Sequence, residues 1–159
     1  MVAIRSIVRI LAASAVLLSN PALAANVEAD LDQIAQTMER AGYQPEQGSS
    51  AGERYIKAKL DQYEFLVLPF GCDDMQRNCR SVQFFISFDP EKSPSLEAMN
   101  AYSRENRWGR IYLDKEGDPA LEFDLDLEEG GMSEALFLDN LAYWETVVQA
   151  YATFVFGEE

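Results

Sequence analysis

The chain has 159 residues, of which 48% are hydrophobic and 25% charged, and it carries a formal net charge of −14 and no histidine. Such a chain repels nucleic acid and anionic lipid, and suits a soluble protein or a basic partner. The absence of histidine excludes Ser-His-Asp and Cys-His catalysis and histidine-based metal sites. We therefore expect a protein without a cofactor, a metal or a nucleic-acid partner, and not an enzyme.

Residues 1–24 have the features of a secretory signal peptide. Arg5 and Arg9 form a short basic region, residues 10–18 are apolar but too few to span a bilayer, and Ala22-Leu23-Ala24 is an A-x-A cleavage site. An uncleaved N-terminal anchor is the alternative. No cysteine stands at the cleavage point to carry a lipid. The sequence thus predicts a periplasmic protein that is cleaved near Ala24 and has no stable membrane anchor.

The remainder, residues 25–159, has the length of one domain. Its first element is a predicted helix over residues 26–41, where apolar residues recur at helical spacing before a glycine. The stretch "PEQGSSAGE" is predicted to be a loop. Residues 55–60 alternate between polar and apolar and predict a strand.

Two apolar runs, "YEFLVLPF" and "SVQFFISF", predict a hairpin whose loop contains both cysteines, Cys72 and Cys79. An even number of cysteines in an exported protein suggests one disulfide, and the C-x6-C spacing is not that of a C-x-x-C redox motif. If the cysteines lie opposite each other, Val67 faces Phe84 and apolar meets apolar. The other face of this hairpin is too apolar to be fully solvated; it carries Leu66, Leu68 and Phe85.

The second half predicts a helix, a second hairpin and a long helix. Ser93-Pro94 has the form of an N-cap followed by a first-turn proline, and the helix should run to about Asn106 with Leu96, Met99 and Tyr102 inward. Ser133 should cap the last helix, which should end close to Gly157. The predicted order α-β-β-β-α-β-β-α, with short turns between antiparallel neighbours, indicates an α+β domain.

The second hairpin, "RIYLDKEGDPALEFDLDLEE", is rich in carboxylates. A three-residue loop with Gly117 in the left-handed conformation would place Arg110 opposite Glu122 and Ile111 opposite Leu121. The acidic side chains of residues 122–128 would then form one solvated face of the sheet, which discourages edge aggregation.

Two sharper interpretations of these carboxylates stay open. Glu122 and Asp124 have the spacing of an acid pair on one strand face, which an envelope enzyme acting on a glycan would need. Asp114, Glu116 and Asp118 alternate in the turn and could form a calcium-responsive site, although their glycine precedes the third acid, unlike in an EF-hand.

The segment "NAYSRENRWGRIYLDKEGDPALEFDLDLEEGGMSEALF" resembles the YbjN-domain family, described as bacterial sensory transduction regulators. The matching features are Asn106-Arg107, Gly109-Arg110, Tyr112-Leu113-Asp114, Gly117-Asp118, Asp124-Leu125-Asp126-Leu127 and Gly130-Gly131 before a helix. The resemblance implies a fold like that of type III secretion chaperones, with three helices on a mainly antiparallel five-stranded sheet. It also implies binding and regulation rather than catalysis, and dimerisation as in the chaperones. The signal peptide and the cysteine pair depart from the cytosolic members.

Excess apolar surface predicts where a partner would bind. The last helix has two apolar stripes, and the second, which includes Tyr143, Val147 and Phe154, exceeds what a surface helix needs. Together with Leu66, Leu68 and Phe85 it suggests a homodimer seam or a groove for a client peptide or protein; burial inside one domain is the alternative. Arg107, Trp108 and Arg110 are further candidate contacts, with ordinary packing as the alternative for the first two.

Overall fold

The computed structural model describes residues 26–157, so the predicted signal peptide and cleavage site lie outside the described residues. The described part is an α+β fold, which confirms the predicted class. Its elements are α1 (Leu31–Arg40), β1 (Glu46–Ser50), β2 (Glu53–Leu60), β3 (Tyr63–Phe70), β4 (Ser81–Ser87), α2 (Leu96–Glu105), β5 (Arg110–Leu113), β6 (Pro119–Asp126) and α3 (Glu134–Phe156).

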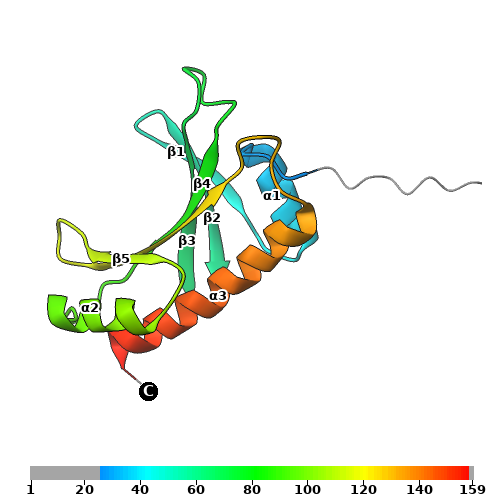
Figure 1. The fold of residues 1–159 in the computed structure, drawn as a ribbon. Coiled ribbons are helices and arrows are strands. Elements are labelled where there is room, and N and C mark those ends of the chain that lie inside the picture. Colours follow the sequence, from blue (N-terminus) through cyan, green and yellow to red (C-terminus); the bar gives the residue numbers. More distant parts are fainter. Residues whose placement is uncertain (1–25, 158–159) are drawn as a thin grey trace, which may run out of the picture.

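The strands form one antiparallel sheet in the order β1-β2-β3-β4-β6-β5. In Figure 1, α1 and α3 lie on one side of this twisted sheet, and α2 lies beside β5 near the end of α3. None of the helices within residues 26–157 has the length and apolarity needed to cross a membrane.

The sheet has six strands and not the five that were expected, because the predicted loop contains β1. This strand is polar throughout and has no alternation to reveal it, so it owes its conformation to backbone pairing with β2. Gly48 pairs with Tyr55, and a Cβ atom at Gly48 would lie 2.5 Å from the tyrosine ring. The close approach of ring and backbone explains why glycine stands there.

Both predicted hairpin registers are confirmed. Val67 lies opposite Phe84 in the β3–β4 pair, and Arg110 lies opposite Glu122 in the β5–β6 pair. Gly117 has a φ of 91° in the tight turn between β5 and β6, as the loop length predicted.

The starts of two helices differ from the prediction. α1 begins at Leu31, with Asp30 as its N-cap, because Val27 forms an isolated β-bridge with Met132. The N-cap of α2 is Ser95 and not Ser93, whose hydroxyl donates a hydrogen bond to the carbonyl of Gly117 (2.8 Å).

α2 turns the predicted side toward the core, except at its first residue, Leu96. Met99 is buried and Tyr102 half-buried, but Leu96 is 67% exposed, so its predicted inward position is wrong. α3 begins after the predicted cap, Ser133.

The hydrophobic core lies between the sheet and the helices. Trp144 of α3 is fully buried and contacts the rings of Phe65, Phe84 and Phe123, which come from β3, β4 and β6. These contacts identify the face of the sheet that the helices cover. The whole first apolar stripe of α3 is buried there: Phe137, Leu141, Trp144, Val148, Tyr151 and Val155.

Candidate functional site

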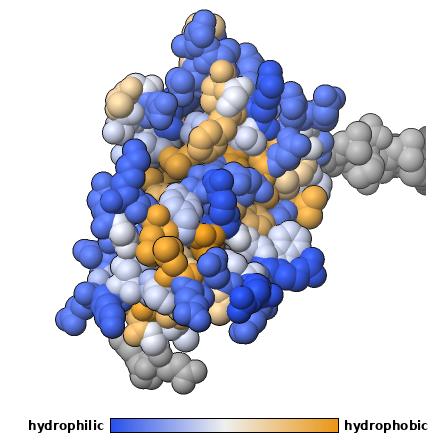
Figure 2. Space-filling model, turned by 60° about the vertical axis from the view of Figure 1, so that its left-hand side comes forward, coloured by the Kyte–Doolittle hydropathy of each residue, from blue (hydrophilic) through white to orange (hydrophobic). Residues whose placement is uncertain are grey.

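The opposite face of the sheet is not covered by any helix within residues 26–157, and we call it the open face. Strand alternation places on it the neighbours of the core residues. One row of paired residues crosses five strands, with Lys57, Leu66, Phe85, Glu122 and Arg110 side by side. Figure 2 turns the left side of Figure 1 forward and shows hydrophobic surface running down the middle between hydrophilic groups. The sheet therefore presents a partly apolar surface to solvent.

A groove of about 630 Å³ lies at one end of the open face, between the β1–β2 turn and the loop that joins β3 to β4. Leu66, Leu68 and Phe70 of β3 line it, and Phe70 is 46% exposed. The remaining lining residues are Ser50, Ala51, Glu53, Arg54, Tyr55, Lys57, Pro69, Gly71, Cys72 and Gln76. An apolar strand surface between two raised loops is a concave site of the size that ligands and short peptide segments occupy.

The wall formed by the β3–β4 loop is held in shape by covalent and polar contacts. Cys72 and Cys79 form the disulfide that closes it. Inside the loop, the Asp73 carboxylate accepts hydrogen bonds from the backbone N–H groups of Met75 and Arg77 and from the side-chain amide of Asn78, at 2.8–2.9 Å. The bond from Arg77 is the first cause of the lowered pKa of Asp73. The wall is thus organised before any partner arrives.

Glu122 lies in the middle of the open face but is only 7% exposed, so the prediction that the acidic row is fully solvated is wrong at this position. The Arg110 guanidinium pairs with Oε2 of Glu122, and the Tyr112 hydroxyl donates to Oε1 at 2.6 Å. Burial raises the pKa of Tyr112 to about 12, and its bond to Glu122 acts in the same direction. The next acids along β6, Asp124 and Asp126, are exposed as predicted.

This geometry gives little support to the other two interpretations of the acidic hairpin, the carboxylate pair that acts on a glycan and the calcium site. Both carboxylate oxygens of Glu122 already bind protein groups, which leaves no free oxygen to act on a glycan. In the turn, Oδ1 of Asp114 accepts from the backbone N–H groups of Glu116 and Asp118 at 3.0 and 2.9 Å. Among residues 26–157, no three His, Cys, Asp or Glu side chains gather as they would around a metal ion.

The other predicted contact residues lie on the helix side of the molecule. Trp108 is 51% exposed, and its backbone has the left-handed conformation, with a φ of 65°. The centre of its ring lies 5.2 Å from that of Tyr143, which is 42% exposed. The guanidinium of Arg107 lies 5.6 Å from the Trp108 ring centre. Val147 is buried, and Phe154 is half-buried against Tyr102. The predicted residues are therefore divided between two surfaces, and only Leu66, Leu68, Phe85 and Arg110 share the open face.

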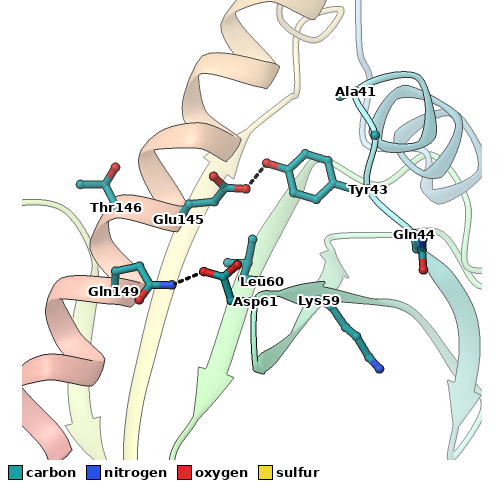
Figure 3. Close-up of a pocket in the computed structure, with 10 residues that line it drawn as sticks. Ala41, Tyr43, Gln44, Lys59, Leu60, Asp61, Glu145, Thr146 and Gln149 are labelled. Atoms are coloured by element: carbon teal, nitrogen blue, oxygen red, sulfur yellow. Dashed lines mark hydrogen bonds between the residues drawn. The ribbon is translucent and has the colours of Figure 1, made fainter. Parts of the chain in front are cut away.

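A second cavity, of about 590 Å³, lies between α3, the β2–β3 turn and the segment that follows α1 (Figure 3). Tyr43 donates a hydrogen bond to Glu145, and Gln149 donates to Asp61 at 3.0 Å (Figure 3). Burial raises the pKa of Tyr43, and the bond to Glu145 adds to the rise. No periodic pattern in the sequence predicts this polar site. The polar side chains of this cavity bind one another and connect α3 to the segment after α1 and to the β2–β3 turn. We therefore assign the cavity a structural role.

The family model that matches residues 30–156 is that of YbjN, described as a putative bacterial sensory transduction regulator. The chain belongs to the YbjN family. The match spans every helix and strand described above and confirms the resemblance seen in the sequence. No curated protein matches the chain.

Proposed function

We propose that this YbjN protein is an exported, non-catalytic binding module that regulates through capture of a peptide or protein segment on its open face. The proposal needs no cofactor and no reacting group. Membership of a family described as sensory transduction regulators supports the regulatory part. The predicted signal peptide and the disulfide support an oxidising compartment such as the periplasm.

The observation that carries the proposal is the apolar groove on a sheet face that no described helix covers. Sheets normally bury one face and solvate the other, and the solvated face is then polar. Here β3 places Leu66, Leu68 and Phe70 on the uncovered side, under a wall fixed by a disulfide. Phe70 is exposed and the two leucines are partly exposed. Grouped apolar side chains that solvent can reach, beside a concave wall, are typical of a site for another chain.

Site-specific photocrosslinking in cells tests the location. A photoreactive amino acid replaces Leu68 in the full chain, and in a matched control it replaces Leu96, a 67% exposed leucine on α2. We expect crosslinked protein adducts from position 68 and far fewer from position 96. Equal yields at the two positions, or none at 68, would count against the groove. An adduct of twice the mass that contains only this chain would identify a second copy as the occupant.

Export is tested separately from binding. The protein recovered from the periplasmic fraction should begin close to Ala25 and should contain no free thiol. A protein that stays in the cytoplasm with Cys72 and Cys79 reduced would contradict the periplasmic location and leave the groove proposal to the crosslinking result.

A further inference from the structure

The open face has an uneven distribution of charge. Its basic groups are already paired: Lys57 lies 3.7 Å from Glu46 and 3.5 Å from Glu64, Lys59 lies 4.0 Å from Glu64, and Arg110 pairs with Glu122. Arg54, which also lines the groove, pairs with Asp32 at 2.7 Å. The two exposed acids on the same face, Asp124 and Asp126, form no ion pair with any residue in 26–157. The local charge left for a partner is therefore negative.

These acids run beside the apolar residues at a fixed offset. Leu68 pairs with Gln83, which pairs with Asp124, and Phe70 pairs with Ser81, which pairs with Asp126. The apolar row on β3 and the acidic row on β6 are therefore two strand spacings apart. This distance is about 10 Å. That offset is close to the diameter of an α-helix with its side chains, about 10–12 Å. Between the rows, the Gln83 amide donates to Asp124 at 2.9 Å and orients it.

From this arrangement we infer that the occupant of the groove is a cationic amphipathic segment of another protein or peptide. The inference rests on the proposed function and adds the chemistry of its partner. Apolar side chains of the segment lie on Leu66, Leu68 and Phe70, and its lysine or arginine side chains reach Asp124 and Asp126. A second copy of the chain fits less well, because the sequence is strongly acidic, with a formal charge of −14 before the signal peptide is removed, and each copy brings the same unpaired acids to the interface.

The test uses two synthetic probes with the protein recovered from the periplasm. One is an 18-residue fluorescent peptide of leucine and lysine with an apolar and a basic face, and the other has glutamate in place of every lysine. Fluorescence anisotropy should show binding of the leucine–lysine peptide and at least tenfold weaker binding of the leucine–glutamate peptide. Raising the salt concentration should weaken the first interaction, because exposed charges are screened.

Substitutions in the protein test separately whether the acidic residues and the apolar residues contribute to binding. Asp124→Asn with Asp126→Asn should weaken binding of the basic peptide at least tenfold. The matched control, Glu105→Gln with Asp139→Asn, removes two exposed charges from α2 and α3 and should change binding less than twofold. Leu68→Ser should also weaken binding tenfold or more, and Leu96→Ser should not. Leu66→Ser provides a second apolar variant if Leu68→Ser unfolds, as judged by its melting temperature.

The outcomes are distinguishable. If Leu68→Ser weakens binding but the double asparagine variant does not, or if both peptides bind equally, the basic partner is overturned and the groove stands. If neither site variant changes binding of the basic peptide, the peptide binds elsewhere and both ideas lose their support. If neither peptide binds, the inferred chemistry is wrong and crosslinking at position 68 decides the groove. A dimer in sedimentation that Leu68→Ser dissociates would replace the peptide by a second copy.

Discussion

The two faces of the sheet differ in what holds their side chains in place. On the covered face, β4 and β6 contribute Phe84 and Phe123, which are buried against Trp144 of α3. On the open face, the adjacent positions are Phe85, half-buried, and Glu122, which is buried only by its own neighbours within the sheet. The covered face is thus stabilised by packing between layers, and the open face by contacts within one layer.

Because of this difference, the covered face contributes mainly to stability and the open face can contribute to binding. Residues that contact α3 contribute buried area and close packing, so substitutions there affect folding first. Leu66, Leu68 and Phe70 have no second layer above them within the described chain, so their apolar surface is free to contribute to a complex. Substitutions that differ mainly in the face on which they fall should therefore differ in their effect on stability.

The largest effect should come from adjacent phenylalanines on β4. Phe84→Ala should lower the free energy of unfolding by about 3–5 kcal/mol, because it empties a fully enclosed position. Phe85→Ala should lower the free energy of unfolding by only about 1 kcal/mol, since the side chain of Phe85 is only partly buried. Urea unfolding followed by circular dichroism measures both. Equal losses would mean that the open face is covered in solution.

Removal of the disulfide comes next. Cys72→Ser with Cys79→Ser should lower the free energy of unfolding by about 2–3 kcal/mol, because the unfolded chain gains the entropy of an open loop. Peptide binding should weaken as well, since the wall of the groove loses its covalent closure while the Asp73 hydrogen bonds remain. An unchanged urea midpoint would show that those hydrogen bonds alone hold the loop.

A smaller effect should distinguish two acids of β6. Glu122→Gln should lower the free energy of unfolding by about 1–2 kcal/mol, because the neutral amide weakens the charge-assisted hydrogen bonds with Arg110 and Tyr112. Asp126→Asn, four residues later and exposed, should stay within about 0.5 kcal/mol of the wild type. If the two variants lost the same stability, the hydrogen bonds at Glu122 would contribute nothing beyond surface charge.

The smallest effect concerns alkaline pH. The pKa of Tyr112 is raised to about 12, against an ordinary value of about 10 for tyrosine. The folded state therefore holds this proton more tightly than the unfolded state, and the associated stability is complete below about pH 10 and lost as the pH approaches about 12. Tyr112→Phe lacks this group, so its melting temperature should fall less steeply than that of the wild type across that range. Parallel curves for the two proteins would contradict the assignment.

How far the sequence could predict this structure depends on periodicity. The registers of both hairpins followed from alternation, because one residue of slip would have turned apolar side chains to the wrong face. β1 gave no such signal, since its pairing uses backbone groups that every residue has. Leu96 was misassigned because the N-cap is Ser95 and not Ser93, so Leu96 is the first residue of the helix and lies before the part that contacts α3.

The candidate site shows the same limit. The excess of apolar residues at positions 66, 68 and 85 was visible in the sequence, because alternation places these three large side chains at strand positions where polar residues are expected. The groove itself was not visible, since its walls come from the β1–β2 turn and the disulfide loop, which meet only across the folded sheet. Tyr143 was predicted to share a partner surface with Leu66, Leu68 and Phe85, but it lies on the helix side, where its ring meets that of Trp108, a separately predicted contact.

By itself the sequence determined the family, the α+β class, the hairpin registers and the cysteine pair that closes the β3–β4 loop, because each is encoded by residues that are close along the chain or by strict alternation. Only the tertiary structure decided which face of the sheet the helices cover and which acid is buried. A strand presents its two faces with the same period, and the packing of α3 selects between them. Glu122 is buried because Arg110 and Tyr112 lie beside it on the neighbouring strand, a contact that exists only once β5 and β6 have paired.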